Sequence, residues 1–216
     1  MQFLVTKKIK ELYPELTVLM LGDFADELFH GYRYFHKAPN AIESELESIR
    51  IMTENHDYYL KRVEKCISYF GIEGRPPYTD YRLIQFYQTI NSEFKWCGNE
   101  SIEKKLVRDA FKGFLPDEIL YAPKVAFSDG TTNINDIWHK TIERYVETLY
   151  TDEEFNERIK KYENYLKPHN KEALYIHENF DKYFPNQYHI LKKYWLPKWV
   201  ECNGNPSASV LEGYQT

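Results

Sequence analysis

A short apolar run that ends at a glycine and leads into a helical pattern constrains the fold of this chain more than any other stretch. The run covers residues 17–21, TVLML, and Gly22 follows it. Branched and long apolar side chains bounded by a glycine are typical of a buried strand. In residues 25–34 the apolar side chains then recur at helical spacing on one face. The sequence therefore predicts a strand, a tight turn and a helix.

Three acidic residues crowd this turn and the first turn of the predicted helix. They are Asp23, Asp26 and Glu27. The unpaired backbone N–H groups and the positive dipole end of a helix start can bind phosphate. Acidic residues in a first turn are also the ordinary choice for capping a helix. The residues by themselves leave both interpretations open.

Composition indicates a globular protein and argues against several functional classes. The chain has 216 residues, of which 43% are hydrophobic, enough for a packed core. A net charge of −5 with scattered basic residues disfavours nucleic acid as a partner. No apolar run approaches the roughly 20 residues that span a bilayer, and the start MQFLVTKKIK has too short an apolar part for a signal peptide. We expect a cytoplasmic protein without membrane contacts, with Cys66, Cys97 and Cys202 as free thiols.

The remaining pattern predicts an α/β fragment dominated by helices. Residues 1–13 are predicted to form a helix stopped by Pro14. After Asn40 the chain is predicted to be helical almost throughout, with no second convincing strand. One parallel-sheet strand-turn-helix unit would thus precede a mostly helical region. Because one strand cannot cover both its faces or pair both its edges, we expect neighbouring strands to be missing from this chain.

Three irregular stretches are predicted to interrupt the helices after Asn40: 71–80, 91–101 and 121–130. The first contains two adjacent prolines, which exclude a helix. The second ends at Ser101, the predicted cap of the next helix, and the third has Lys124 in its middle. Residues 1–185 are predicted to form a partial domain and residues 186–216 a loop-rich tail.

Three segments, in order along the chain, resemble the motifs of one enzyme family. LGDFADELFHGY is similar to Ser-Gly-Glu-Gly-Ser-Asp-Glu-(Leu or Val)-Phe-Gly-Gly-Tyr, and GIEGRPPYTD is similar to Gly-(Val or Leu)-Glu-Ala-Arg-Val-Pro-Phe-Leu-Asp. EKKLVRDAFKGFLPDEILYAPKVAFSDG is similar to a motif that opens with Glu-Lys-x-x-Leu-Arg-x-Ala-Phe and closes with Lys-x-x-Phe-Ser-Asp-Gly. Over nearly all its length the chain resembles the C-terminal, synthetase half of glutamine-hydrolysing asparagine synthetase.

This resemblance implies an ATP-dependent amide ligase. In the family, aspartate attacks ATP-Mg to give β-aspartyl-AMP and pyrophosphate, and ammonia then displaces AMP. The matched positions imply that Gly22 and Lys124 bind phosphate, and that Asp26 binds the nucleotide and Mg²⁺. Asp23 stands where the family has the glutamate that positions ammonia or takes its proton. Asp23 and Lys124 are therefore the implied catalytic residues.

Two more matched residues are implied to contact ligands. Glu27 would bind nucleotide and aspartate, and Arg75 would bind aspartate. The alternative for Arg75 is an ion pair with Glu73 or Asp80, and the alternative for Lys124 is a solvated position in a loop. If the family roles apply, three charged groups face one open depression: Asp23, Asp26 and Lys124.

The first motif departs from the family at four positions. Leu21 and Ala25 replace serines, and Phe24 replaces a glycine, which is predicted to crowd the nucleotide side. Asp23 is one methylene shorter than the family's glutamate. A misplacement of roughly 1 Å can reduce a rate by on the order of 100-fold. These changes argue against turnover by the chain alone.

The chain also lacks the family's Ser-Gly-Gly-Leu-Asp-Ser pyrophosphate loop and its glutaminase, and we expect it to be truncated before that loop. No Gly-x-Gly-x-x-Gly or Walker loop replaces it. Two alternatives follow. The chain is either a ligase piece that needs an N-terminal glutaminase and pyrophosphate-loop partner and uses aspartate with ammonia or glutamine-derived ammonia, or a catalytically silent binding or assembly module. Alone, it is expected to bind ATP-Mg weakly and to make no asparagine; the sequence leaves a homodimer open.

Overall fold

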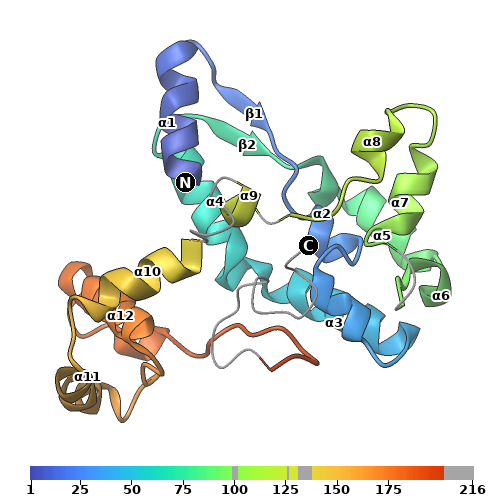
Figure 1. The fold of residues 1–216 in the computed structure, drawn as a ribbon. Coiled ribbons are helices and arrows are strands. Elements are labelled where there is room, and N and C mark those ends of the chain that lie inside the picture. Colours follow the sequence, from blue (N-terminus) through green and yellow to red (C-terminus); the bar gives the residue numbers. More distant parts are fainter. Residues whose placement is uncertain (99–101, 126, 131–137, 202–216) are drawn as a thin grey trace. The chain divides into compact units, whose positions relative to one another are not determined.

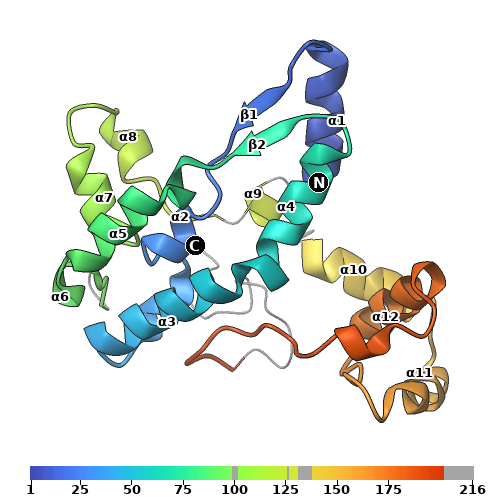
Figure 2. The same cartoon turned by 180° about the vertical axis from the view of Figure 1, so that it is seen from behind.

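The computed structural model describes residues 1–98, 102–125, 127–130 and 138–201, which divide into two compact units (Figures 1 and 2). Among the described residues, the first unit lies within Met1–Lys124 and includes Lys198–Val200, and the second lies within Val125–Pro197 and includes Glu201. Each unit has a hydrophobic core of its own.

Helices make up most of the first unit, as the sequence predicts. The α-helices are α1 Gln2–Leu12, α2 Ala25–Leu28, α3 Ala41–Glu54, α4 Tyr59–Ser68, α5 Tyr81–Thr89, α6 Ser92–Lys95, α7 Lys105–Ala110 and α8 Asp117–Leu120. Short 3₁₀ helices are η1 Arg33–Lys37, η2 Asn55–Asp57 and η3 Pro77–Thr79. Helix α1 ends just before Pro14, which has no N–H to extend it. Helix α3 begins after Asn40, whose side chain accepts a hydrogen bond of 2.9 Å from the Glu43 backbone N–H.

The sheet of the first unit pairs two distant strands in parallel. Strand β1 is Val18–Met20, strand β2 is Glu73–Arg75, and Leu19 lies opposite Gly74. The predicted strand and the parallel sheet are confirmed. The prediction of a loop throughout residues 71–80, with no second strand, is wrong at β2. Glu-Gly-Arg has no apolar pattern, and it is a strand only because the chain returns from α4 alongside β1.

Helix α4 covers one face of this strand pair. Its Val63 and Ile67 form a buried cluster against which Leu19 packs. Because side chains alternate along a strand, the neighbouring residue Met20 lies on the other face, where it is 64% exposed. Both charged residues of β2 are exposed as well. On this face Met20, Glu73 and Arg75 are thus exposed, and Val18 is partly buried.

The turn after β1 places Phe24 in a left-handed backbone conformation with φ of 74°. This conformation is costly for a residue with a side chain and natural for glycine, the family residue at this position. The ring is only 7% exposed and packs with Leu28, Phe29 and Tyr87. The prediction that Phe24 crowds the nucleotide side is therefore wrong, because its ring fills the core.

Helix α2 is one turn long and does not extend through residues 25–34 as predicted. His30 adopts a φ of 54°, which ends the helical path after Leu28. The Gly31 backbone N–H then donates to the Asp26 carbonyl oxygen over 2.8 Å and closes the turn. The apolar residues whose spacing predicted one helix are thus divided between α2, η1 and the turn that joins them.

Two other predicted loops each contain one helical turn. Within residues 91–101, helix α6 starts after Asn91, whose side chain accepts a hydrogen bond of 3.0 Å from the Glu93 backbone N–H. Within residues 121–130, the turn is α9, Phe127–Gly130. The predicted cap Ser101 lies outside the described residues.

The second unit is helical around an aromatic core. After α9 come α10 Trp138–Glu147, α11 Asp152–Arg158 and α12 Lys171–Tyr183, with 3₁₀ helices η4 Ile159–Tyr162 and η5 Tyr188–Ile190. The core residues are Val146, Tyr150, Tyr162, Leu174 and Tyr188. Thr151 and Glu154 form a reciprocal capping box at the start of α11.

Two further expectations concern membrane-spanning helices and cysteine pairing. None of its helices combines the length and apolar character that crossing a bilayer requires. Within the described part of the chain, Cys66 and Cys97 form no disulfide, as predicted, and Cys202 lies outside the described residues.

Candidate functional site

The three acidic residues lie in one short stretch, between the end of strand β1 and the first turn of helix α2. Asp23 lies in the turn before α2, and Asp26 and Glu27 lie in the first turn of the helix. Asp23 and Asp26 both raise the pKa of Glu27 by their charge, after the larger effect of burial. Each carboxylate accepts a hydrogen bond from a different part of the first unit.

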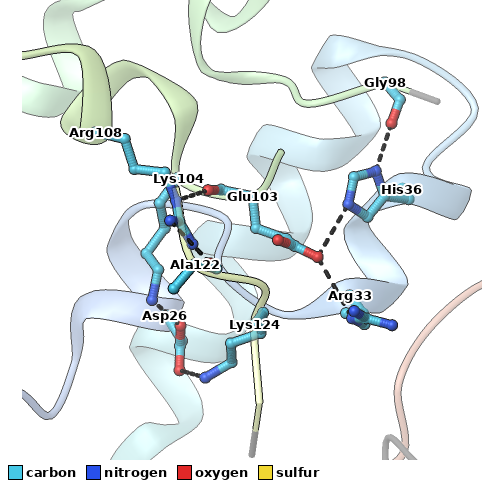
Figure 3. Close-up of polar contacts among 9 residues, drawn as sticks. All are labelled: Asp26, Arg33, His36, Gly98, Glu103, Lys104, Arg108, Ala122 and Lys124. Carbon is cyan, nitrogen blue, oxygen red and sulfur yellow. Dashed lines mark hydrogen bonds and ion pairs between the residues drawn. The ribbon is translucent and has the colours of Figure 1, made fainter. Parts of the chain in front are cut away.

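Asp26 binds two ammonium groups that are distant in sequence. Lys124 Nζ donates to Asp26 Oδ2 and Lys104 Nζ donates to Asp26 Oδ1, each over 2.7 Å (Figure 3). The three side chains are 19–22% exposed. Burial opposes ionisation of Asp26, but the charges of Lys124 and Lys104 and their hydrogen bonds outweigh it and lower the pKa of this carboxyl. The structure thus joins Asp26 to Lys124, across 98 positions of sequence.

A glycine allows this position of the Asp26 carboxylate. A Cβ added at Gly31 would lie 2.2 Å from Asp26 Oδ1 and 2.9 Å from Asp26 Cα. Real Cβ atoms do not approach other atoms so closely, so either the backbone or the carboxylate would have to move. Gly31 is therefore part of the site although it offers no side chain.

Glu103, the residue before Lys104, is held by two cationic side chains, those of His36 and Arg33. Lys104 itself has a left-handed φ of 58°, and Glu103 is 5% exposed. Glu103 Oε1 lies 3.2 Å from His36 Nε2 and 3.6 Å from Arg33 Nε (Figure 3). His36 Nδ1 donates to the carbonyl oxygen of Gly98 over 2.7 Å. Since a carbonyl and a carboxylate only accept, both ring nitrogens carry hydrogen, and His36 is an imidazolium.

The pKa of His36 agrees with this contact pattern. Hydrogen bonds with Cys97 and Glu103 raise it to about 10, against the opposing effect of burial. The charged imidazole and Arg33 in turn lower the pKa of Glu103, although burial opposes this. The backbone that carries Lys104 is therefore held by an ionic cluster at ordinary pH.

Arg108 connects the segments that carry the two lysines. Its Nε donates to the Glu103 carbonyl oxygen over 2.7 Å, and its guanidinium donates to the Ala122 carbonyl oxygen over 3.1 Å (Figure 3). The guanidinium also donates to the carbonyl oxygen of Leu120. One side chain thus binds the backbone beside Lys104 and the backbone four and two residues before Lys124. The spacing of the two ammonium groups depends on these contacts.

Asp23 and Glu27 each accept a hydrogen bond from a tyrosine. Tyr59 Oη donates to Asp23 Oδ1, and Tyr32 Oη donates to Glu27 Oε1, both over 2.7 Å. Glu27 is 3% exposed, and its backbone carbonyl accepts a hydrogen bond of 2.7 Å from Ser48 Oγ. Burial raises the pKa of Glu27, although the hydrogen bond from Tyr32 opposes the shift.

Gly22 and Arg75 lie at the carboxyl ends of the two parallel strands. The Leu21 backbone N–H donates to the Arg75 carbonyl oxygen over 3.1 Å, so these ends are adjacent. Among the described atoms, nothing lies within 4 Å of a Cβ added at Gly22. The Arg75 side chain pairs with Glu73 over 2.8 Å and is 57% exposed. Its observed contact is thus the ion pair that the sequence offered as an alternative.

Sequence reasoning missed two residues of this site. Lys104 stands in the Glu-Lys-Lys stretch that was predicted to continue into a regular helix, and its motif position was the one available signal. Tyr59 carried no signal, because an aromatic residue at helical spacing is ordinarily part of a core. Both side chains reach the acidic stretch only through the tertiary fold.

This arrangement suits a phosphate better than a divalent cation. Two ammonium groups offer charge-assisted donors to phosphate oxygens. Both Asp26 oxygens already accept hydrogen bonds from ammonium groups. The described part of the chain contains no group of three His, Cys, Asp or Glu side chains that could hold a metal ion. The donor set as arranged therefore fits a polyphosphate and does not fit Mg²⁺.

Comparisons with known proteins point in one direction. The family described as Asparagine synthase matches residues 43–201. A probable glutamine-hydrolyzing asparagine synthetase from Acanthamoeba polyphaga mimivirus is 36% identical over 211 residues, 97% of this chain. The glutamine-hydrolyzing asparagine synthetases of Cricetulus griseus and Homo sapiens are 35% and 34% identical over 216 residues, 99% of this chain. The chain spans 38% of the length of each of these relatives.

Proposed function

Because the chain belongs to the asparagine synthase family, we propose that it supplies half of the site of an amide ligase that joins ammonia to aspartate with ATP. The observation that carries this proposal is the convergence of Lys104 and Lys124 on Asp26, next to a helix start. Two ammonium groups, each 2.7 Å from a different oxygen of the Asp26 carboxylate, are placed to bind one polyphosphate between them. ATP would supply the leaving group that activates the aspartate carboxylate.

The phosphate contacts are assigned to three positions. Lys124 and Lys104 donate to phosphate oxygens, and Asp26 holds both ammonium groups in place in the absence of nucleotide. The Gly22 backbone N–H is a further donor, and the open space around it supports this role. Mg²⁺ binding by Asp26 stays a prediction, and it requires at least one ammonium group to leave the carboxylate. No step is assigned to the metal.

Contacts with aspartate and ammonia are assigned to the other charged residues that match the family motifs. Glu27 is an acceptor for the amino group of aspartate, and the pKa raised by burial means that a cationic ligand would favour its ionised form. Arg75 is a donor for a substrate carboxylate if its exposed pair with Glu73 opens. Asp23 positions ammonia or accepts its proton.

A second polypeptide segment is part of this proposal. Two short strands make a sheet of marginal stability, and parallel sheets are ordinarily covered on both faces. The exposed Met20 on the face away from α4 supports a partner that packs there. The partner we propose carries the glutaminase and the pyrophosphate loop, and with it the reaction takes place in the cytoplasm with glutamine-derived ammonia.

Titration calorimetry with ATP tests the phosphate half of the proposal. The chain alone is expected to bind ATP weakly, and Lys124→Met and Lys104→Met are each expected to weaken binding further, by about tenfold. Lys105→Met is the matched control, because Lys105 is the next residue and pairs with Asp109 on the surface. Equal affinity in all four proteins would contradict the assignment of the two lysines.

Ammonia-dependent synthesis tests the ligase half. The chain alone is expected to make no asparagine, whereas mixing it with a separately expressed N-terminal piece is expected to give asparagine and pyrophosphate in equal amounts. Product from the chain alone would show that no partner is needed. No product in either case, together with no ATP binding, would favour a silent module.

The silent module is a second candidate, and one observation favours it. Asp26 is fully engaged by its own lysines, so nucleotide must compete with an internal ion cluster. A module of this kind would use the first unit only to bind its partner. Binding of the N-terminal piece without any ATP binding is the result that separates it from the ligase.

A further inference from the structure

The Asp23 side chain has one hydrogen-bond donor among the described residues, the hydroxyl of Tyr59. The two residues are 36 positions apart in sequence, and their oxygens Oη and Oδ1 are 2.7 Å apart. Tyr59 is the first residue of α4, and Asp23 follows the strand that α4 covers. The contact therefore depends on the packing of the helix against the sheet.

The ring of Tyr59 is itself fixed from two sides. It packs against the buried cluster of Val63 and Ile67, one and two turns further along α4. On another side the Arg62 guanidinium carbon lies 4.5 Å from the ring centroid, a cation–π contact. A ring held in this way can orient a short side chain that has few rotamers of its own.

We propose that Tyr59 is a positioning residue that holds the Asp23 carboxylate, the shorter acid of this chain, in the orientation needed to receive ammonia. This inference rests on the proposed function, in which Asp23 positions ammonia or takes its proton. Because Asp23 Oδ1 accepts the hydrogen bond from Tyr59, Asp23 Oδ2 is the oxygen that would accept a hydrogen bond from an N–H group of ammonia. The phenol thereby makes up for the methylene that Asp23 lacks relative to glutamate.

The chemistry of the step defines what Tyr59 must do. The ammonia nitrogen forms a bond to the acyl carbon of the activated aspartate, and the bond from that carbon to the phosphate oxygen breaks. One N–H proton passes to Asp23, so the carboxylate must be ionised before the step. Burial, and then the hydrogen bond to Asp23 and its charge, raise the pKa of Tyr59. The phenol thus stays a donor and does not compete as the base.

Kinetics with the partner-complemented chain test this role. Tyr59→Phe removes only the hydroxyl and is expected to lower kcat/KM for ammonia about tenfold while KM for ATP is unchanged. The double variant Asp23→Glu/Tyr59→Phe is expected to regain part of that loss, because the longer acid reaches without the phenol. Tyr58→Phe is the matched control and is expected to behave like the wild type. Equal losses for ammonia and ATP, or no loss, would overturn the proposal.

A titration that needs no activity separates this inference from the proposed function. In protein labelled with ¹³C at Tyr Cζ, the Tyr59 signal is assigned as the one that Tyr59→Phe removes. Asp23→Asn is expected to lower the pKa of Tyr59, because it removes the negative charge that opposes phenolate formation. An unchanged Tyr59 titration would overturn the contact, even where asparagine is made. A shifted titration with no asparagine under any condition supports the contact and counts against the ligase.

Discussion

Two ion-pair arrangements, one in each unit of the chain, differ in what holds them together. In the first unit, Asp26 is 22% exposed and joins lysines that lie 78 and 98 positions further along the chain. In the second unit, Glu157 is 73% exposed and pairs with Lys160, within one helical turn. The first arrangement depends on the whole tertiary fold, and the second depends on local helix geometry alone.

This difference separates charges that tertiary contacts hold partly buried from charges that stay solvated on a surface. Exposed ion pairs contribute little, since water screens them and ordering two long side chains costs entropy. Partly buried clusters lose hydration, and they persist where a fold or a ligand site requires them. The stability of the second unit should therefore come from its aromatic core, and that of the acidic stretch from its charge contacts.

The largest effect is expected from the core of the second unit. Tyr162 is 1% exposed and its ring centroid lies 5.1 Å from those of His177 and Tyr188. Tyr162→Ala should cost about 3–5 kcal/mol, the usual range for a buried aromatic residue. Hydrogen exchange should show lost protection in α10 and α12 and unchanged protection around Asp26. An equal loss in both units would show that they unfold together and would break the comparison.

The next largest effect is expected at the centre of the ionic cluster. Asp26→Asn leaves two ammonium groups without their carboxylate and should cost about 2 kcal/mol at pH 7. Because the pKa of Asp26 is lowered in the folded state, this difference should be constant above its usual value of about 3.9 and shrink as pH falls through the folded value. Urea unfolding of both proteins from pH 7 down to pH 3 measures it. A difference that grows toward low pH would contradict the assignment.

A smaller effect is expected beside the same carboxylate. Gly31→Ala places a methyl group against Asp26 Oδ1 and should cost about 1–2 kcal/mol through forced movement. Gly22→Ala is the matched control, since a Cβ there meets no described atom within 4 Å. Thermal unfolding compares the two. If Gly22→Ala is the more destabilising change, the close contact at Gly31 does not constrain the site.

The smallest effect is expected on the surface of the second unit. Glu157→Gln removes the charge that pairs with Lys160 and should leave the midpoint of thermal unfolding unchanged within experimental error. The same measurement in high salt should give the same result for wild type and variant. A clear loss of stability would show that this surface pair matters and would weaken the contrast between the units.

The sequence predicted those parts of the fold that are encoded locally. Strand β1 was visible because its side chains are apolar, whereas β2 was not, because Glu-Gly-Arg becomes a strand only by pairing with β1. The end of α2 was missed because the left-handed backbone of His30 does not follow from an apolar pattern. These misses share one cause, which is that tertiary contacts override local preference.

The candidate site shows the same division. The motif resemblance identified Asp26 and Lys124, and the structure adds Lys104 and Tyr59. A lysine in a helical pattern looks like any solvent-facing lysine, and a tyrosine at core spacing looks like any residue that fills a core. Their roles come from the position of α4 and of the segment before α7, which a single sequence does not specify.

The left-handed Phe24 has a consequence for how this chain can change over generations. A return to glycine would relieve the backbone strain of roughly 1–2 kcal/mol, but it would also remove a buried ring worth about 3–5 kcal/mol of packing. Phe24→Gly is therefore disfavoured as a single substitution, although phenylalanine is itself a poor residue for that backbone. Because Leu28, Phe29 and Tyr87 pack around the ring, glycine becomes acceptable only after those neighbours have changed. A lineage that acquired Phe24 together with its surrounding core is therefore expected to keep phenylalanine at this position.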